Sequence, residues 1–441
     1  MNRLPVNRLL LAGTAAVCTA AVLLLGGVFR ADGDAAATAR PPSASAETFP
    51  QPYALGDTAA FVASLQSSLR RNPRDVHAYD LLGLAYQQRA RETGDPTYYP
   101  KADGVLRHAL ALAPHDFLAT SGLGSLALSR HRFREALALG LRAHRLSPST
   151  ARNYGVVGDA LVELGRYRAA FRAFDTFARV KPGVASYARV SYARELRGDT
   201  TGAVHAMRLA QDAAVDEPEA TAWTRVQLGK LFWSHGRLAA AAREDRLALA
   251  AFPRYVYAYD ALAQVEAARG RIDRAIALER RAVDVIPLPQ FVGTLGDLYR
   301  VAGNLRVARR QYATIGVIER LLRANGVRTD LETALFDVDH GVRLRRALAL
   351  ARVARHDRPS IDGDDVLAWA LERNGRCTAA RAASGRSLRL GTLDAAKFFH
   401  RGMIERCLGN DDVARRWFRR ALALNPHFSL LWAPVARRYA S

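Results

Sequence analysis

The chain has 441 residues, of which 49% are hydrophobic and 24% are charged, and its 64 lysine and arginine residues against 42 aspartate and glutamate residues give a formal charge of +22. With half of the residues apolar and only three cysteines, the composition excludes a disulfide-dense miniprotein, a collagen and a wholly disordered chain. Only four of the basic residues are lysines, and we interpret the arginine excess as a coding bias. An anionic partner, either nucleic acid or a membrane, is the alternative that the charge suggests.

The first predicted element is a membrane-spanning helix. Leu9–Phe29 contains no charged residue, and Arg3 and Arg8 precede it. At 1.5 Å per residue it would span about 30 Å, the thickness of the hydrocarbon core. Because the apolar core of a cleaved signal peptide has only roughly 7 to 15 residues, we predict an uncleaved signal anchor over residues 1–30, with cleavage and a secreted protein as the alternative. The basic flank stays inside, so we expect a single-pass protein of the cell membrane whose bulk is extracytoplasmic.

Residues 31–54 are rich in Ala, Pro and Ser and show no periodicity, which predicts a flexible linker. A repeat of about 34 residues then begins and continues to residue 441. Its clearest mark is an alanine at the start of each second helix of a helical pair. These alanines are Ala102, Ala136, Ala170, Ala203, Ala241, Ala275, Ala308, Ala347, Ala380 and Ala414.

Glycines and prolines keep the same register. A small residue, usually glycine, stands twelve positions before the alanine, as at Gly158 and Gly402, and a proline often stands twelve positions after it, as at Pro182 and Pro426. The small residues let two antiparallel helices approach closely, and the proline ends the second helix. A further glycine is expected to end each first helix in the left-handed conformation. These turn glycines are Gly165, Gly198, Gly236, Gly270, Gly303, Gly375 and Gly409.

The residues in this register resemble the tetratricopeptide repeat. One unit carries Tyr154, Val157, Gly158, Leu161, Tyr167, Ala170, Phe174 and Pro182. The resemblance covers residues 55–441 and implies an all-α fold, a helical-hairpin solenoid of about ten repeats that follows the N-terminal transmembrane helix. We expect Asp57–Arg71 and Phe428–Tyr439 to be capping helices, because the ends of a solenoid must cover exposed core. The first unit departs from the pattern by an insertion at Arg91–Pro96, and the seventh by a second helix that is lengthened after Ile315.

In the tetratricopeptide family, the first helices line a concave surface on which peptides or helices of partner proteins bind. Fifty positions share that face by helical spacing, and they hold eleven acidic and five basic residues, whereas bases predominate elsewhere. We therefore predict an acidic and aromatic groove for a basic protein or peptide partner. Its candidate residues are Tyr192, Trp223, Trp233, Tyr257, Asp260, Asp297, Glu332, Phe336, Asp339, Asp365, Trp369, Glu372 and Phe399. Other charged positions of the face are Asp80, Asp159, Glu163, Glu195, Asp362, Arg152, Lys230, Arg300, Arg373 and Arg406. The alternative is that the aromatics pack between repeats and the acids pair with arginines.

Catalytic signatures are absent from the sequence. It contains no HExxH, no GxSxG, no phosphate-binding GxxxxGK[ST] and no GxGxxG between a strand and a helix. The histidines do not pair with cysteines at metal-ligand spacing, and the acidic run Asp362–Asp365 lacks the spacing of a calcium loop. We expect no enzymatic activity, no cofactor and no metal.

Two cysteines occupy related positions. Cys377 starts the second helix of the ninth unit and Cys407 ends the first helix of the tenth, so both should lie at one edge of adjacent repeats. In an oxidising compartment they could form a disulfide. Two separate buried thiols are the equal alternative.

These patterns together suggest a membrane-anchored, exported scaffold or adaptor that binds protein partners. We do not expect nucleic acid as the partner, because the basic excess falls outside the predicted groove. Two other functions stay open. One is the binding of an anionic polymer or lipid by the arginine-rich outer surface, and the other is the role of an accessory subunit in an enzyme complex.

Overall fold

The computed structural model describes residues 58–215 and 217–441. The predicted membrane segment Leu9–Phe29 and the predicted linker at 31–54 lie outside these residues. Within the described ranges the regular secondary structure consists of 22 helices, α3 to α24. None of these helices is both long and apolar enough to cross a membrane.

Helix α3 (Thr58–Arg71) precedes ten helical hairpins, and α24 (Ala433–Ala440) follows them. The first helices of the hairpins are α4 (Val76–Thr93), α6 (Phe117–Ser129), α8 (Arg152–Glu163), α10 (Val184–Leu196), α12 (Pro218–Trp233), α14 (Val256–Ala268), α16 (Pro289–Val301), α18 (Asp330–Asp339), α20 (Ile361–Arg373) and α22 (Ala395–Cys407). The second helices are α5 (Tyr98–Leu112), α7 (Phe133–Leu146), α9 (Tyr167–Val180), α11 (Thr200–Asp212), α13 (Leu238–Ala251), α15 (Ile272–Val285), α17 (Leu305–Ala324), α19 (Leu344–Asp357), α21 (Cys377–Ser387) and α23 (Asp411–Leu424). Each first helix packs against the second helix that follows it, and each second helix except α17 packs closely against the next first helix.

The packing confirms the physical reasons for the repeat. All ten register alanines are buried, and a Cβ atom at Gly158 would lie 2.3 Å from the ring of Phe174. All seven predicted turn glycines have φ between 68° and 80°, the left-handed region that glycine adopts without steric cost. His131 takes this conformation in a turn without glycine, at φ 55°, and the turn between α18 and α19 has both Gly341 and Arg343 in it, at φ 67° and 45°.

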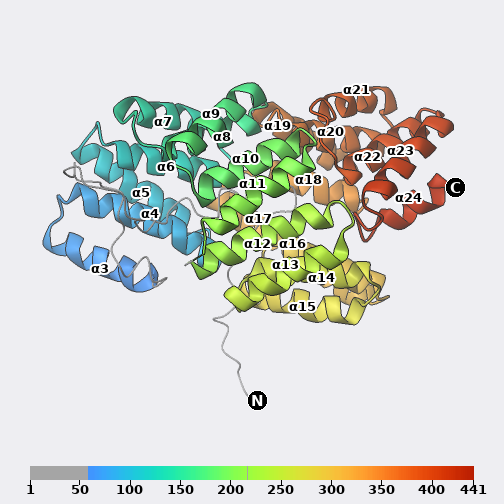
Figure 1. The fold of residues 1–441 in the computed structure, drawn as a ribbon, viewed down its shortest axis with the longest axis horizontal. Helices are drawn as coiled ribbons and strands as arrows, with labels where there is room; N and C mark the ends of the chain where they lie inside the picture. The colour runs from blue at the N-terminus through green and yellow to red at the C-terminus, as the bar shows by residue number, and fades with distance from the viewer. Residues whose placement is uncertain (1–57, 216) are drawn as a thin grey trace, which may run out of the picture.

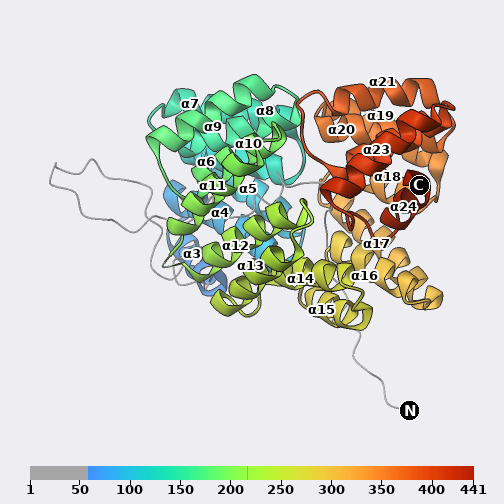
Figure 2. The ribbon, with the colours of Figure 1, turned by 45° about the vertical axis from the view of Figure 1, so that its right-hand side comes forward.

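The hairpins wind into a superhelix. Figure 1 shows the chain running from α3 over α6–α9 and down through α10–α13 to α14 and α15, after which it returns through α16 and α17 to α18–α24. Successive turns then contact each other about 195 residues apart in sequence, as where Ile361 N donates to the Tyr167 hydroxyl at 2.6 Å and Asn425 Nδ2 donates to Trp233 O at 2.9 Å. In Figure 2, α20 accordingly lies next to α8 and α10. This stacking encloses part of the concave surface.

Three irregular elements differ from the average unit. At the predicted insertion, α4 extends to Thr93. Tyr99, at the start of α5, packs against the apolar cluster of α16 and α17. Helix α17 has 20 residues, in agreement with the predicted lengthening. The predicted C-terminal helix Phe428–Tyr439 begins too early, because the chain forms turns until Trp432 and α24 begins at Ala433. Those turns let Leu430 pack against the apolar cluster of α14–α16.

Candidate functional site

A cavity of about 710 Å³ lies on the concave surface between the two turns of the superhelix. Its walls come from α10, α12, α14, α16, α18, α20 and α22, together with α13 and the C-terminal segment 425–437. Eight carboxyl groups line it against three lysine or arginine side chains, which is the opposite of the balance in the whole chain. We call it the concave cavity.

The carboxyl groups on the wall formed by α16, α18 and α20 have partners. Asp297 Oδ1 accepts from the Tyr312 hydroxyl at 2.6 Å and lies 2.8 Å from His340 Nε2, while His340 Nδ1 lies 2.8 Å from the carbonyl oxygen of Phe336. Both ring nitrogens thus face acceptors, and only the imidazolium can donate to both. Burial lowers the pKa of His340, but the hydrogen bond to Asp297 and the charges of Asp297 and Asp339 outweigh it, so the pKa is raised.

One oxygen of each neighbouring carboxyl has a partner as well. Trp369 Nε1 donates to Asp339 Oδ1 at 2.9 Å, and Asp365 Oδ2 lies 3.0 Å from His400 Nδ1. The His400 ring stacks on Trp369 at 4.7 Å between centroids. Desolvation lowers the pKa of His400, yet the charge of Asp365 and its hydrogen bond raise it overall. The imidazolium is therefore the form that this wall favours.

Lys397, at the start of α22, closes the far end of this wall. Its Nζ lies 2.8 Å from Asp362 Oδ1 and 2.6 Å from Asp394 Oδ2. Although burial alone would lower the pKa of Lys397, the negative charges of Asp362 and Asp394 raise it well above its ordinary value. This buried ammonium and its two carboxylates form a compensated group.

The opposite wall, formed by α10 and α12–α14, is less well compensated. It carries Glu195, Asp245 and Asp260 around Lys230. A Cβ atom at residue 229 would lie 2.5 Å from Asp245 Oδ1, so the glycine at this position leaves the space that the carboxyl of the second helix occupies. Burial raises the pKa of Glu195 to about 7, raises that of Asp245 well above its ordinary value, and lowers that of Lys230.

Aromatic side chains form the end of the cavity near the C-terminus. Trp432 lies 5.4 Å from Trp369 and 5.5 Å from Phe399 between ring centroids. The indole Nε1–H groups of Trp432 and Trp233 have no hydrogen-bond partner among residues 58–215 and 217–441. The cavity thus combines apolar surface, carboxyl groups and free donors.

Seven of the thirteen groove residues predicted from the sequence line the concave cavity. They are Tyr192, Trp233, Asp260, Asp297, Asp339, Asp365 and Phe399. The other six lie elsewhere: Trp223 and Trp369 are buried in the core, Tyr257 packs edge-on against Phe291, Glu332 pairs with Arg358, Phe336 stacks on His340, and Glu372 lies near Arg373.

Several cavity residues fall outside the predicted face. Asp245 belongs to a second helix, Asp394 and Lys397 lie at the start of α22, and Trp432 lies in the C-terminal segment. Helical spacing could not identify Asp245, because its access depends on a glycine of another helix. Trp432 reaches the cavity only because the chain turns at 425–432 instead of continuing as a helix.

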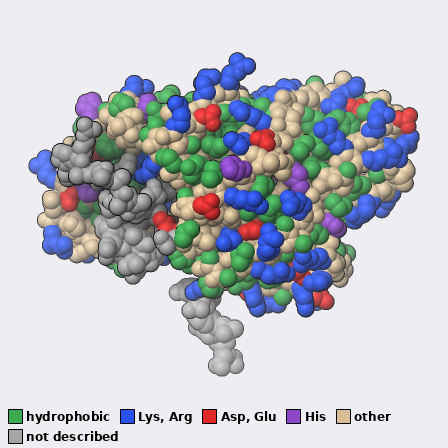
Figure 3. Space-filling model, viewed as in Figure 1, with side chains coloured by type: hydrophobic (Ala, Val, Ile, Leu, Met, Phe, Trp, Pro, Cys, Tyr) green, Lys and Arg blue, Asp and Glu red, His purple; other side chains and the backbone are tan. Residues whose placement is uncertain are grey.

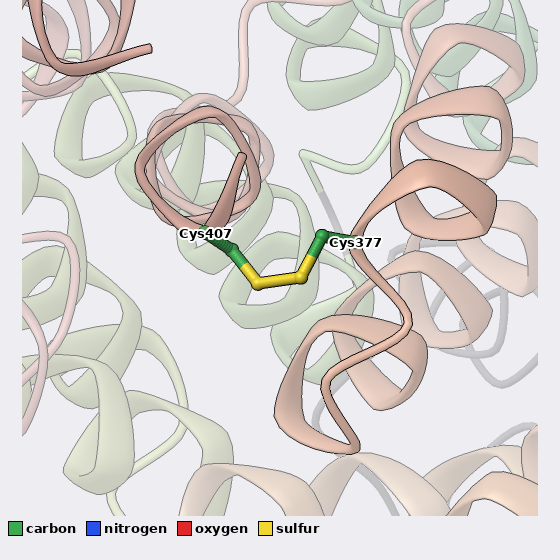
Figure 4. Close-up of a disulfide and its surroundings, with 2 residues drawn as sticks. All are labelled: Cys377 and Cys407. Atoms are coloured by element: carbon green, nitrogen blue, oxygen red, sulfur yellow. A yellow bond between two sulfur atoms is a disulfide. The ribbon is translucent and has the colours of Figure 1, made fainter. Parts of the chain in front are cut away.

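Cys377 and Cys407 are joined by a disulfide, with their Cα atoms 5.8 Å apart (Figure 4). It links the start of α21 to the end of α22 and lies at the edge of adjacent hairpins. In the described part of the chain, no group of three or more His, Cys, Asp or Glu side chains is arranged to hold a metal ion.

Comparison with known proteins finds one family model and several solved structures that are similar to this chain. A family model of the tetratricopeptide repeat matches residues 226–288 and 366–427. The solved structures that match include the APC/C hetero-tetramer Cut9–Hcn1, at 13% identity over 89% of this chain and 95% of that chain, with a TM-score of 0.37. A human IFIT1 dimer with PPP-AAAA matches at 15% identity over 85% and 88%, with a TM-score of 0.45. YrrB, described as a TPR protein with an unusual peptide-binding site, matches at 19% identity over 41% and 92%, with a TM-score of 0.28. A search of curated proteins finds no match.

Proposed function

Because the chain is built from tetratricopeptide repeats, we propose that it is a non-catalytic scaffold that binds a basic, partly apolar segment of a partner protein in the concave cavity. The observation that carries this proposal is the reversal of charge: carboxyl groups outnumber lysine and arginine on the cavity wall of a chain whose formal charge is +22. Aromatic walls beside carboxyl groups suit cationic side chains and apolar neighbours.

The size of the cavity limits what can enter. Its volume of about 710 Å³ lies within the roughly 300 to 1,000 Å³ that is typical of small-ligand pockets. A short segment of a partner fits this space, whereas a folded domain does not. The partner therefore contributes an exposed loop or terminus.

The proposal includes the membrane. Leu9–Phe29 anchors the protein in the cell membrane, and the repeats work on the extracytoplasmic side. The disulfide between Cys377 and Cys407 supports this side, because disulfides persist in oxidising compartments. In this arrangement the scaffold recruits its partner at the outer surface of the membrane.

A second candidate is the binding of an anionic polymer or lipid headgroups by the outer surface. Figure 3 shows lysine and arginine side chains spread over the whole visible face, among fewer acidic ones. Such binding would depend on counterion release and would fall steeply with salt, whereas capture of a segment in a buried cavity should survive moderate salt.

The test is the retention of labelled peptides by the full-length protein. Arg-rich and Glu-rich peptides with equal aromatic content are compared at low and moderate salt. We expect selective, salt-tolerant retention of the Arg-rich peptide, weakened by Trp233→Phe on the cavity wall but not by Trp417→Phe, which lies outside the residues that line the cavity. Equal retention of both peptides would refute the proposal, and retention of Glu-rich peptide or nucleic acid that salt abolishes would favour the second candidate.

A further inference from the structure

The carboxyl groups of the concave cavity are not equivalent. Those on the wall of α16–α22 are matched by His340, His400, Lys397 and the indole N–H of Trp369. On the opposite wall, Glu195, Asp245 and Asp260 surround Lys230, and the charge of Lys397 also acts on Glu195. On the wall of α16–α22 only Asp365 Oδ1, among the buried carboxyl oxygens that line the cavity in the described residues, lacks a hydrogen-bond partner, whereas the wall formed by α10 and α12–α14 combines an unpartnered carboxyl oxygen with unpartnered donors.

Asp260 and Asp245 differ in their hydrogen bonds. The Asp260 carboxylate accepts from Gln264 Nε2 at 3.1 and 3.2 Å. Asp245 is 1% exposed, and its Oδ1 has no hydrogen-bond partner in the described part of the chain. Asp245 therefore offers a buried acceptor on the cavity wall that this protein itself does not use.

Donors without partners stand on the same wall. The Nε2 amide of Gln227, a residue that is 3% exposed, and the Nε1–H of Trp233 find no acceptor among residues 58–215 and 217–441. Both belong to α12, and both line the cavity. Leaving a buried donor or acceptor unsatisfied costs free energy, and a ligand that supplies the missing groups recovers that energy.

A single residue of a peptide can satisfy both sets of groups if its side chain is cationic. The cationic side chain donates to the carboxyl groups, and the peptide carbonyl oxygens accept from the free N–H groups. We propose that Glu195, Asp245 and Asp260 receive the cationic head of one arginine or lysine of the partner, while Gln227 and Trp233 donate to carbonyl oxygens of the partner's main chain. This inference rests on the proposed function, since it names the part of the partner that the cavity selects.

Binding is coupled to protons. Burial raises the pKa values of Glu195, Asp245 and Asp260, and a bound cation favours their charged forms, so binding of the cation releases protons from this cluster. Affinity therefore rises with pH through the region of about 7, where Glu195 titrates. The charged groups that influence the three carboxyls are Lys230, Glu244, Arg246, Glu279, Asp362, Asp394 and Lys397.

Two blocked pentapeptides test the proposal on the full-length protein: Ala-Ala-Arg-Ala-Ala and the same peptide with neutral citrulline in place of arginine. We expect the arginine peptide to bind at least about ten-fold more tightly at pH 8, with a smaller difference at pH 5. Calorimetry in two buffers of different ionisation enthalpy should detect release of about one proton for the arginine peptide and none for the citrulline peptide.

Matched variants locate the effect. Asp260→Asn and Glu195→Gln should each weaken the arginine peptide about ten-fold and leave the citrulline peptide unchanged. Asp273→Asn makes the same chemical change at an exposed position of α15 and should change neither. Because both cavity variants replace buried carboxyls by neutral amides, we expect them to fold, and thermal melting checks this.

The outcomes separate the two proposals. Equal binding of the arginine and citrulline peptides, or equal effects of Asp260→Asn and Asp273→Asn, would overturn the inference. If a longer Arg-rich peptide still binds to Asp260→Asn and Glu195→Gln with wild-type affinity, the scaffold function stands and this subsite is refuted. If no Arg-rich peptide binds to the wild-type protein, the proposed function falls and the inference falls with it.

Discussion

Arg358 joins the two turns of the superhelix, and replacing it should open them. Its guanidinium donates to Glu163 at 3.0 Å through Nη2 and to Glu332 at 3.1 Å through Nη1, and it lies 5.3 Å above the ring of Phe133. The two members of the closest pair, Arg358 and Glu163, have side chains that are only 4% and 3% exposed. We choose Arg358→Met, which keeps much of the length of the side chain and removes its charge.

The magnitude follows from the buried carboxylates that the variant leaves behind. Breaking a buried pair by removing one partner costs about 3 to 5 kcal/mol, whereas replacing both partners can be nearly neutral. Burial already raises the pKa of Glu163 although Arg358 lies beside it. Without Arg358 we expect the Glu163 carboxyl to bind a proton rather than remain charged. The double variant with Glu163→Gln should therefore recover part of the lost stability.

Hydrogen exchange is the appropriate assay, because repeat arrays can open locally without global unfolding. Peptides covering 159–170 and 355–365 should exchange faster by two to three orders of magnitude, at about 1.4 kcal/mol per ten-fold change. Arg189→Met is the matched control, because the buried Arg189–Asp159 pair, at 2.7 Å, links neighbouring hairpins of one turn. Arg189→Met should speed exchange near α8 and α10 without enlarging the radius of gyration in solution scattering. Arg358→Met should enlarge the radius of gyration. A change below ten-fold at the crossing, or an unchanged radius, would refute this reasoning.

Three further predictions concern packing, the disulfide and pH. Gly158→Ala should lower the free energy of unfolding by about 1 to 3 kcal/mol through overpacking. Gly104→Ala, where an added Cβ meets nothing within 4 Å, should raise it by about 0.5 to 1 kcal/mol. Chemical denaturation measures both changes, and equal effects would contradict the packing argument. Cys377→Ser should lower the free energy of unfolding by about 3 to 4 kcal/mol, because the disulfide closes a loop of 30 residues. Thiol titration of the denatured, unreduced wild type should find one free thiol, and three free thiols would contradict the disulfide. The pKa of His400 is raised above 6.5 by Asp365, so this pair stabilises the fold below about pH 6.5, and the stabilisation is lost as pH rises through the raised pKa. The fall in melting temperature with rising pH should be smaller in Asp365→Asn. Identical pH profiles of the melting temperature in the variant and the wild type would refute this prediction.

The repeat itself could be predicted because its marks are local. The buried alanines, the glycines beneath bulky side chains and the left-handed turn glycines each follow from contacts within one hairpin. Helical spacing alone connects them, so one sequence is sufficient. The lengthening of α17 could be predicted for the same reason.

Contacts between turns could not be predicted. Glu163 occupies a position of the predicted concave face, yet its partner Arg358 lies 195 residues away, and no periodicity links them. Trp369 also has the spacing of a groove residue, but the C-terminal segment and His400 cover it. The tightness of the superhelix decides which concave residues stay accessible, and that property arises from the summed geometry of all hairpins.

The central claim is that a cationic segment of a partner enters the concave cavity. It is tested most directly by photo-crosslinking an Arg-rich peptide that carries a diazirine residue to the full-length protein, with mass spectrometry to locate the crosslinks. We predict crosslinks to wall residues of α10, α12 and α14 and to the segment 425–437, with competition by unlabelled Arg-rich but not Glu-rich peptide. Crosslinks confined to the outer arginine-rich surface, or competition by both peptides alike, would contradict the account.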